Sequence, residues 1–389
     1  MSNLFPTYNK KTINFQNGKG TYLYDDENNK YLDFLSGIAV CNLGHCHPKV
    51  VNALKEQVES IWHVSNLFTI KKQEELAKVL VKSFKDGLVF FCNSGTEANE
   101  AAIKLARKHS GKSHIISFKQ SFHGRTFGSM AATGQSKIHE GYGEMLSGFT
   151  YVPYNDLNAL ENEINENTGA IILEVIQGEG GVIVGNNDFF EGVQALCEKH
   201  ELLLIVDEVQ TGVGRTGTMF AYEQTPLNPD IITLAKGLGN GFPVGAMLGK
   251  NNLANTFSLG AHGSTFGGNY LAMAAAFETI NIINDLQFLN SVKDKGQYLI
   301  DKLVEMKEEF PQIIEIRGKG LMLGIELNQS VDQLVEQFLK NGLIVGTAGP
   351  NVLRLLPPIN LSYEEIDEAI QIMNQVLSSY LLDSQVKNV

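Results

Sequence analysis

The stretch Gly87–Gly111, GLVFFCNSGTEANEAAIKLARKHSG, indicates the fold class of this chain. It opens with a short apolar and aromatic run typical of a buried strand, and a turn follows at residues 93–95. A helical pattern begins at Thr96 and ends at Gly111. Strand-like runs that end in loops recur downstream, at residues 114–124, 170–181, 202–217 and 230–249. This alternation predicts an α/β fold whose central sheet is mainly parallel and flanked by helices.

The regions on either side of this α/β pattern differ from it. Residues 19–37 predict a β-hairpin with an Asn-rich turn, and residues 73–84 predict an amphipathic helix. Helical patterns resume at residues 271–285, 290–310 and 363–382. We therefore expect a large domain formed by residues 56–270. A smaller α+β domain should combine the N-terminal segment, residues 1–55, with residues 271–389.

Composition limits the classes of partner. The 389 residues carry a net charge of −12 and contain no basic block, so nucleic acid is not expected as a partner. The N-terminus lacks the apolar core of a signal peptide, and no apolar run approaches the ~20 residues needed to span a membrane. We expect a soluble cytoplasmic protein. Its four cysteines, Cys41, Cys46, Cys92 and Cys197, should be reduced thiols.

One short cluster contains residue types that bind zinc: Cys41, His45, Cys46 and His47. Adjacent side chains usually point in different directions, and no CxxC pair elsewhere could complete four tetrahedral ligands. The alternative is a turn that leads into a helix at Pro48. The sequence favours the turn, and no metal is expected.

Several loops at predicted strand ends carry candidate binding groups, and in open α/β sheets ligands bind beyond the carboxyl ends of the strands. Gly95 and Thr96 open a helix whose N–H groups can bind a phosphate, with an ordinary N-cap as the alternative. Ser264 and Thr265 lie among glycines and suit another phosphate or carboxylate contact, unless they belong to a plain flexible loop.

The loop SFHGRT, residues 121–126, offers an aromatic ring and a guanidinium group. Phe122 could stack on a planar ring, and Arg125 could hold a carboxylate. A core phenylalanine and a solvated arginine are the alternatives.

An apolar run at residues 202–206 ends in two acids, Asp207 and Glu208. A buried carboxylate needs a partner, and the protonated nitrogen of a bound ring would suit Asp207. Gln210 could then hydrogen-bond a neighbouring ring oxygen. The alternative partner for Asp207 is a structural arginine such as Arg215.

Lys236 follows another apolar run and precedes the glycine-rich residues 237–241. A dry pocket disfavours the charged form of lysine and leaves a nucleophilic amine, whereas a snorkelling lysine is the alternative. We expect the glycines to leave room for a flat cofactor, since they lack the G-x-G-x-x-G spacing of a dinucleotide site. A phosphate cradle, a stacking aromatic, a carboxylate and a lysine together form the set that pyridoxal phosphate needs.

These motifs resemble the fold-type I, class III pyridoxal-phosphate aminotransferases. The resemblance extends from residue 5 to residue 380. It is carried by NSGTEANEAAIKLAR, FHGRTFG, LEVIQGEGG, LLIVDEVQTGVGRTG, PDIITLAKGLGNGFPVGA and HGSTFGGN. The implied fold is a large domain that binds the cofactor, accompanied by the smaller α+β domain.

The resemblance also implies roles for matching positions. Lys236 would bind pyridoxal 5'-phosphate covalently, and Asp207 would pair with its ring nitrogen. Gly95 and Thr96 would bind the phosphate, Phe122 and Val209 would cover the two ring faces, and Gln210 would contact the ring hydroxyl. Glu208 would also belong to the cofactor site. Thr265 of the partner subunit would complete it, in a homodimer with shared active sites.

For the substrates, the resemblance implies that Arg125 holds a carboxylate with Ser264 nearby. Arg354 would bind the α-carboxylate of glutamate, and Glu179 would cover Arg354 when the other substrate binds. The implied reaction transfers the terminal amino group of N2-acetyl-L-ornithine to 2-oxoglutarate. Its products are N-acetylglutamate 5-semialdehyde and L-glutamate, in arginine synthesis.

Three alternatives stay open. The amino donor could be ornithine, succinylornithine, 4-aminobutyrate or an acetyl-lysine analogue. A pyridoxal-phosphate mutase or decarboxylase is a second alternative, which the two candidate carboxylate-binding arginines disfavour. A non-catalytic binding protein is the third, and the intact lysine, aspartate and phosphate loop disfavour it.

Overall fold

A seven-stranded sheet forms the centre of the computed structural model, which describes residues 3–386. The strand order is β4-β12-β11-β10-β7-β5-β6. Strands β11, β10, β7, β5 and β6 run parallel, and β12 pairs antiparallel with both β11 and β4. The expected α/β fold with a mainly parallel sheet is confirmed. The strands are β4 (Leu88–Cys92), β5 (His114–Phe118), β6 (Phe149–Val152), β7 (Thr168–Leu173), β10 (Leu203–Asp207), β11 (Ile231–Leu234) and β12 (Gly245–Gly249).

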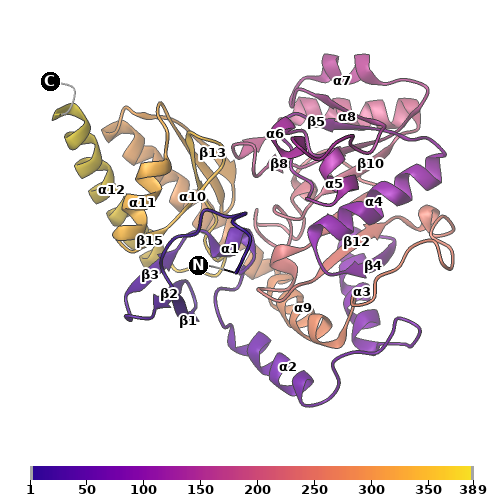
Figure 1. Ribbon diagram of the computed structural model, residues 1–389, viewed down its shortest axis with the longest axis horizontal. Coiled ribbons are helices and arrows are strands. Elements are labelled where there is room, and N and C mark those ends of the chain that lie inside the picture. Colours follow the sequence, from indigo (N-terminus) through magenta and orange to yellow (C-terminus); the bar gives the residue numbers. More distant parts are fainter. Residues whose placement is uncertain (1–2, 387–389) are drawn as a thin grey trace.

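Side chains of these strands alternate between the two faces of the sheet, as strand geometry requires. On one face Ile172 and Ile205 belong to an apolar cluster with Leu105 of α4. On the other face Ile171 and Leu204 belong to a larger cluster that continues into the C-terminal part of the chain. Figure 1 shows helices on both sides of the sheet. They include α3 (Lys71–Phe84), α4 (Gly95–Ser110), α5 (Phe127–Ala132), α6 (Ser136–His139), α7 (Leu157–Glu163) and α8 (Asn187–His200).

Helix α4 begins and ends at residues suited to those positions. The hydroxyl of Ser94 accepts a hydrogen bond from the N–H of Glu97 at 3.3 Å, which is an N-cap. Gly111 closes the helix with φ of 69°, in the left-handed region that glycine adopts without strain. The helix therefore starts directly beyond β4 and points its N-terminus at the carboxyl edge of the sheet.

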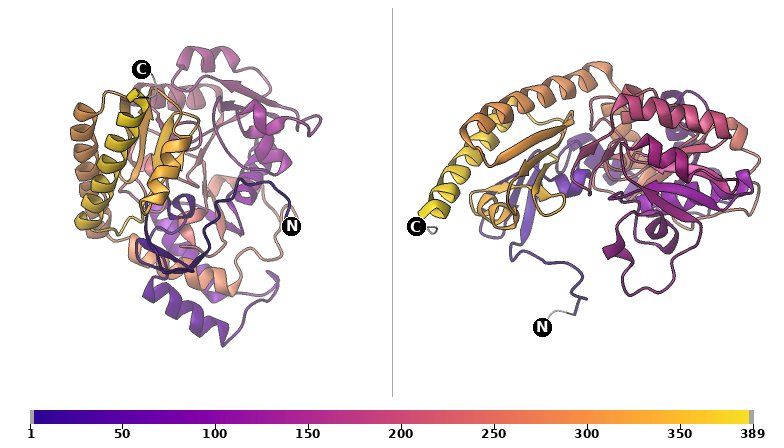
Figure 2. Two further views of the ribbon diagram at one scale, coloured as in Figure 1. Left: turned by 60° about the vertical axis from the view of Figure 1, so that its left-hand side comes forward. Right: turned by 90° about the horizontal axis from the view of Figure 1, so that it is seen from above.

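The N-terminal and C-terminal parts of the chain lie together beside the central sheet (Figures 1 and 2). Leu343 in β15 pairs in parallel with Leu32 in β3, so both ends of the chain share one sheet. That sheet contains β1 (Phe15–Lys19), β2 (Tyr22–Asp25), β3 (Lys30–Asp33) and β15 (Leu343–Ile344). The boundaries at residues 55 and 270 stay our proposal for the two domains.

A second small sheet and three helices complete the C-terminal part. Its strands are β13 (Ile313–Lys319), β14 (Met322–Leu327), β17 (Val352–Leu355) and β16 (Gly346–Thr347), and its helices are α10 (Leu286–Glu309), α11 (Asp332–Lys340) and α12 (Tyr363–Val386). Helices α2 (Pro48–Val58) and α3 pack against α9 (Tyr270–Ile283). The short elements are α1 (Ser36–Ala39), β8 (Ile176–Gln177), β9 (Ile183–Val184), η1 (Ala221–Gln224), η2 (Lys236–Leu238) and η3 (Asn251–Leu253).

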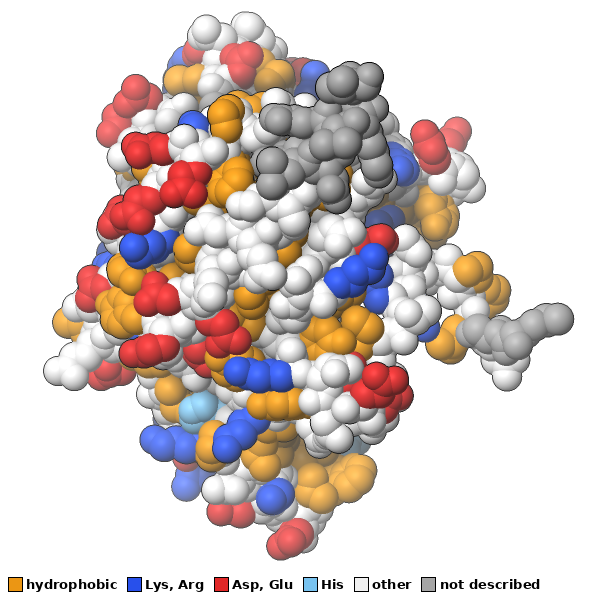
Figure 3. All heavy atoms as spheres, turned by 90° about the vertical axis from the view of Figure 1, so that its left-hand side faces the viewer, with side chains coloured by type: hydrophobic (Ala, Val, Ile, Leu, Met, Phe, Trp, Pro, Cys, Tyr) orange, Lys and Arg blue, Asp and Glu red, His pale blue; other side chains and the backbone are white. Residues whose placement is uncertain are grey.

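Acidic and basic side chains are interspersed on the face turned toward the viewer in Figure 3. Within residues 3–386, no helix is long and apolar enough to cross a membrane. The same part of the chain contains no cluster of three or more histidine, cysteine, aspartate or glutamate side chains arranged to hold a metal ion.

Asp33 organises the turn that follows β3. One carboxylate oxygen accepts hydrogen bonds from the N–H groups of Leu35 at 2.9 Å and Ser36 at 2.8 Å, and the other lies 2.7 Å from Nε2 of His45. All four residues of α1, Ser36–Ala39, have positive φ, so this turn is left-handed. The Ser36 hydroxyl donates to the carbonyl of Leu356 at 2.6 Å. His45 thus has a carboxylate partner within the protein.

This pair predicts a pH-dependent contribution to stability. Burial alone would lower the pKa of His45, but its hydrogen bond with Asp33 raises the pKa to about 10. The stabilisation should be complete below the unfolded value of about 6.5 and decline as pH rises toward about 10. Urea unfolding of the wild type and of His45→Gln measures it. The difference in unfolding free energy should be largest near pH 6 and shrink toward pH 10, and a constant difference would contradict the assignment.

Candidate active site

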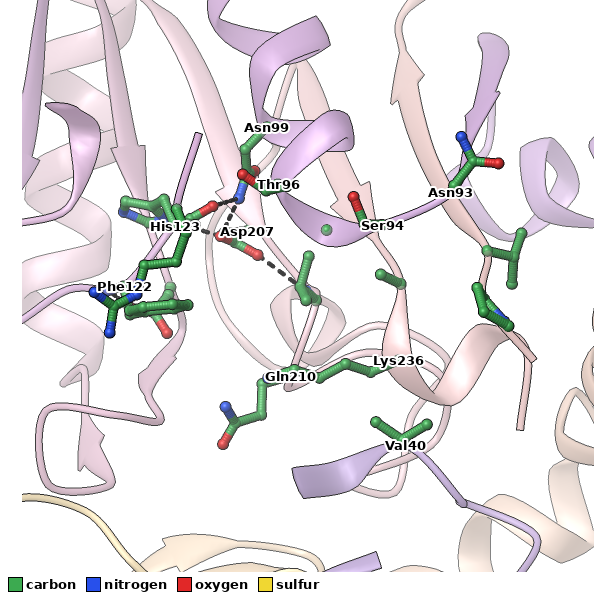
Figure 4. A pocket seen from close by; sticks show the side chains of 18 of the residues that line it. Val40, Asn93, Ser94, Thr96, Asn99, Phe122, His123, Asp207, Gln210 and Lys236 are labelled. Carbon is green, nitrogen blue, oxygen red and sulfur yellow. Dashed lines mark hydrogen bonds and ion pairs between the residues drawn. The ribbon is translucent and has the colours of Figure 1, made fainter. Parts of the chain in front are cut away.

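A cavity of about 420 Å³ opens at the carboxyl edge of the central sheet. The loops beyond β4, β5, β10 and β11 line it, together with Val40, which follows the left-handed turn (Figure 4). Parallel strands place the loops at their carboxyl ends on the same edge, so residues far apart in the sequence meet there. The cavity brings together the predicted residues Gly95, Thr96, Phe122, Arg125, Asp207, Val209, Gln210 and Lys236.

One end of the cavity is formed by the start of α4. Gly95 and Thr96 occupy the first turn, where N–H groups and the positive end of the helix dipole attract anions. The Thr96 hydroxyl lies 2.8 Å from the hydroxyl of Thr126 and 2.5 Å from that of Ser129. A Cβ at Gly124, whose φ is +144°, would come within 2.3 Å of the Thr96 hydroxyl. Only glycine at position 124 leaves this anion-binding end open.

Asp207, at the end of β10, is buried and held by three donors. One carboxylate oxygen accepts from Nδ2 of Asn99 and lies near Nδ1 of His123, each at 2.8 Å. The other oxygen accepts the N–H of Val209 at 3.0 Å. Burial alone would lower the pKa of His123, yet the hydrogen bond with Asp207 raises it above the ordinary value. Asp207 is therefore a fixed carboxylate beside a histidine that favours its protonated form (Figure 4).

The alternative prediction, that Asp207 pairs with Arg215, was wrong. The Arg215 guanidinium is buried elsewhere and donates to the carbonyls of Leu321 and Pro357 and to the side-chain oxygen of Asn42. The groups that hold Asp207 are instead the side chains of Asn99 and His123 and the backbone N–H of Val209.

Lys236 starts the short helix η2 and has φ of 44°, an uncommon backbone conformation for a residue other than glycine. Its side chain lines the cavity. Burial lowers the pKa of its amine, and the nearby Arg354 lowers it further, while Glu179 and Asp207 oppose the shift. The net shift is downward, so more of the Lys236 amine is neutral than in a lysine exposed to water.

The glycines that follow Lys236 have a different role from the one expected. A Cβ at Gly237 would come within 2.3 Å of the Asn42 amide, and a Cβ at Gly239 would come within 2.0 Å of the Phe242 carbonyl. Among the three, only Gly241 lines the cavity. Gly237 and Gly239 allow close packing of protein on protein, and the expectation that they leave room for a cofactor was wrong for these two.

Arg354, in β17, is buried and forms an ion pair with the half-buried Glu179 beside the cavity. Its Nη1 donates to Glu179 at 2.5 Å, to the carbonyl of Gly178 at 2.9 Å and to the side chain of Gln210 at 3.2 Å. Burial alone would raise the pKa of Glu179, but Arg354 lowers it below the ordinary value. Gln210 lines the cavity and also donates to Glu179 at 3.2 Å, so it connects the ion pair to the pocket.

Five predicted site residues do not line this cavity: Arg354 and Glu179, which form the ion pair beside it, and Glu208, Ser264 and Thr265. The Glu208 carboxylate accepts hydrogen bonds from the Thr211 hydroxyl at 2.5 Å and the N–H of Tyr222 at 2.8 Å. Successive side chains of a strand point to opposite sides, so the Glu208 side chain points away from the cavity that Asp207 lines. Ser264 accepts from Nδ2 of Asn93 at 3.2 Å, and Thr265 beside it is exposed.

Asn99, His123 and Glu174 line the cavity but had not been predicted. Asn99 follows Thr96 by three positions, so the two share one face of α4. His123 adjoins Phe122, and Glu174 is an acid directly after a buried strand, as Asp207 is at the end of another. The strand-end rule that selected Asp207 would have found Glu174 as well.

The residues present fit the cofactor that the resemblance implies. Pyridoxal phosphate carries a phosphate, a basic ring nitrogen and an aldehyde, and the cavity offers a helix N-terminus, a carboxylate and an amine of lowered pKa for them. Phe122 supplies an aromatic side chain, with the Arg125 guanidinium carbon 5.7 Å from its ring centroid. Gly124 keeps the anion-binding end open, as described above.

Comparison with known proteins agrees with this assignment. A family model described as aminotransferase class-III matches residues 6–377. The acetylornithine aminotransferase of Listeria innocua serovar 6a is 54% identical over 99% of this chain and 100% of its own length. That of Bacillus subtilis (strain 168) is 52% identical over 98% of this chain and 99% of its own.

Solved structures of two related enzymes superpose over nearly the whole chain. The ornithine aminotransferase of Toxoplasma gondii ME49 gives a TM-score of 0.94 at 30% identity, covering 98% of this chain and 94% of that one. The N-acetylornithine aminotransferase of Stenotrophomonas maltophilia K279a gives 0.85 at 36% identity, covering 97% and 98%. A second structure of the Toxoplasma enzyme has partial occupancy of PLP at its active site.

The lowered pKa of Lys236 predicts its reactivity in the protein without cofactor. Acylation by a small anhydride at a series of pH values, followed by mass spectrometry, reports the neutral fraction of each amine. The Lys236 midpoint should lie below the ordinary lysine value of about 10.4. Exposed Lys71 serves as the internal control. A Lys236 midpoint equal to that of Lys71 would contradict the dry environment of the amine.

Proposed function

Because this chain belongs to the class-III aminotransferase family, we propose that it transfers the terminal amino group of N2-acetyl-L-ornithine to 2-oxoglutarate. The chain is an aminotransferase, and its cofactor is pyridoxal 5'-phosphate. The proposed products are N-acetylglutamate 5-semialdehyde and L-glutamate, a step of arginine biosynthesis. The observation that carries the proposal is the placement of Lys236, Asp207 and the α4 N-terminus around one cavity, in a chain whose full-length relatives include acetylornithine aminotransferases.

Each side chain has a task that follows from its surroundings. When bound, the cofactor supplies an aldehyde that takes up the amino group and a ring that accepts electrons. The first turn of α4, with Gly95 and Thr96, binds the phosphate. Asp207 stabilises a proton on the ring nitrogen, because Asn99 and His123 hold its carboxylate in place.

Lys236 acts as the proton carrier of the reaction. Its lowered pKa increases the neutral fraction of the amine, which can remove a proton from the substrate carbon bearing the amino group and return it later. Phe122 and Val209 would enclose the ring from its two faces, and Gln210 would contact the ring hydroxyl. Exclusion of water by these walls lowers the pKa of the amine and so favours its neutral form.

Two arginines give the site its proposed carboxylate specificity. Arg125 on the exposed loop would hold the carboxylate of N-acetylornithine, with Ser264 nearby. Arg354 would bind the α-carboxylate of glutamate or 2-oxoglutarate, for which the carboxylate of Glu179 now occupies its place. Glu179 must move away for one substrate and can stay for the other, so one cavity could serve two substrates.

We further propose a homodimer in which Thr265 completes the phosphate site of the partner subunit. Thr265 and Phe266 are exposed, and neither lines the cavity of its own chain. Asn66 donates to the carbonyls of Ser264 and Gly267, which fixes the loop that presents them. Exposed aromatic surface beside a fixed loop suits contact with a second copy.

A substrate panel tests the proposed donor. With 2-oxoglutarate as acceptor, kcat/KM for N2-acetyl-L-ornithine should exceed the values for ornithine, succinylornithine and 4-aminobutyrate. Lys236→Ala, which removes the reacting amine, is the matched negative control and should lose the visible absorbance of lysine-bound cofactor. A higher kcat/KM for ornithine would overturn the substrate assignment, and glutamate formation without 2-oxoglutarate would indicate a different reaction class.

Substitutions of Arg354 and Arg125 should affect the KM values of different substrates. Arg354→Lys keeps the charge but loses the planar fork, so the KM for 2-oxoglutarate should rise on the order of tenfold to a hundredfold, with a smaller change for N-acetylornithine. Arg125→Lys should show the opposite pattern. Steady-state kinetics with each substrate varied in turn measures both, and equal effects on the two substrates would contradict the division.

Mixed dimers test the shared site. Thr265→Ala should bind cofactor weakly, and Lys236→Ala should be inactive. Mixing the two variants should restore activity, because one site of the hybrid then combines Lys236 of one chain with Thr265 of the other. Light scattering checks the assembly, and hybrids that stay inactive would exclude a shared phosphate site.

A further inference from the structure

Glu174 is a buried carboxylate to which none of the roles above applies. It follows β7 directly, lines the cavity and is only 5% exposed. Removing a carboxylate from water is costly unless hydrogen-bond donors replace the water. The donors that Glu174 has found therefore indicate what its position serves.

Two backbone N–H groups from different loops bind the two oxygens of this carboxylate. Oε2 accepts from the N–H of Phe122 at 3.0 Å, and Oε1 accepts from the N–H of Gly178 at 3.3 Å. The first loop also carries Arg125, and Gly178 directly precedes Glu179, which pairs with Arg354. One side chain thus joins the two loops that carry the proposed substrate contacts.

We propose that Glu174 is a positioning residue for amino transfer, which holds the Phe122 loop and the Gly178–Glu179 loop in place on the wall of the Lys236 cavity. Its catalytic consequence rests on the function proposed above. The bond to Phe122 determines where the aromatic ring and Arg125 stand. The bond to Gly178 determines where Glu179 meets Arg354, whose Nη1 also donates to the Gly178 carbonyl.

The charges around Glu174 make this bridge sensitive to pH. Burial raises the pKa of Glu174 to about 7, with Asp207 adding to the shift and His123 opposing it. Glu174 also opposes the lowering of the Lys236 pKa. Burial raises the pKa of Tyr154 and Glu174 adds to that shift, while the Tyr154 hydroxyl donates to the Glu174 carbonyl at 2.6 Å. Above about pH 7 both oxygens are free to accept. As pH falls through about 7, one oxygen gains a proton and becomes a weaker acceptor for its N–H partner.

The variant Glu174→Gln imitates the protonated form, because its amide has a single acceptor oxygen for two N–H groups. Hydrogen exchange of the holoenzyme, followed by mass spectrometry, measures both loops. Exchange in residues 119–126 or 176–181 should rise about tenfold, as expected for the loss of one hydrogen bond. Glu223→Gln is the matched control, since Glu223 also accepts a backbone N–H, from Phe220 at 3.3 Å, but does not line the cavity.

Kinetics distinguishes positioning from a merely structural role. Glu174→Gln should lower kcat/KM for both substrates about tenfold or more, since small displacements of contact groups are costly to catalysis. It should also remove the inflection near pH 7 from the wild-type pH profile, while Glu223→Gln keeps it. If Glu174→Gln does not fold, Glu174→Asp, which keeps the charge on a shorter side chain, is measured in the same way.

The outcomes separate the two proposals. Looser loops in Glu174→Gln, in an enzyme that does not use N-acetylornithine, would overturn the proposed substrate and leave the positioning role intact. An active wild type whose Glu174→Gln variant keeps the exchange rates of both loops and the pH inflection would overturn the positioning role.

Discussion

The buried carboxylate of Asp207 is the interaction on which the layout of the cavity depends. Its charge is stabilised by Asn99 from α4 and by His123 from the loop beyond β5, so three elements must meet at the end of β10. Asn99 also accepts a hydrogen bond from the Thr233 hydroxyl at 2.8 Å, in the strand that leads to Lys236. A continuous set of hydrogen bonds therefore links the lysine strand, the helix start and the aromatic loop. The hydrogen bonds that stabilise the buried Asp207 carboxylate therefore also fix the positions of the other groups of the site.

The cavity keeps opposite charges in separate pairs around the Lys236 amine, whose pKa is lowered. Arg354 is occupied by Glu179, and His123 by Asp207. Lys236 has no such carboxylate of its own among the ion pairs within residues 3–386, and burial lowers its pKa. A cation that kept its own carboxylate would hold its proton and could not act as a nucleophile. Burial is the main cause of the lowered pKa of the Lys236 amine, and the separation of pairs preserves that effect.

Local patterns in the sequence, together with the family resemblance, were enough to predict the strands of the central sheet other than β6, the start and end of α4, and eight of the residues that line the cavity. Short apolar runs ending in Asp207 or Lys236 carry this information within a few positions. The partners of those residues depend on contacts across the fold. Arg215 illustrates the limit, because its acceptors at Leu321 and Pro357 lie more than a hundred positions away. No local pattern distinguishes it from Asn99 and His123 as the partner of Asp207.

The glycine-rich run after Lys236 shows the same limit from the other side. Its glycine content predicts that another group approaches the backbone closely, and the structure shows such an approach at Gly237 and Gly239. The neighbours turned out to be Asn42 and Phe242 of the chain itself. Sequence composition indicates that space is needed, whereas only the tertiary arrangement shows which group occupies it.

The left-handed turn at Ser36–Ala39 has a consequence for how the protein is made. Each such residue other than glycine costs about 1–2 kcal/mol, so the turn needs support from outside itself. Part of that support is the carbonyl of Leu356, 320 positions later in the chain. Val40, the next residue after the turn, lines the cavity. During synthesis on the ribosome, this part of the support for the Val40 wall therefore becomes available only after Leu356, the residue that follows β17, has emerged.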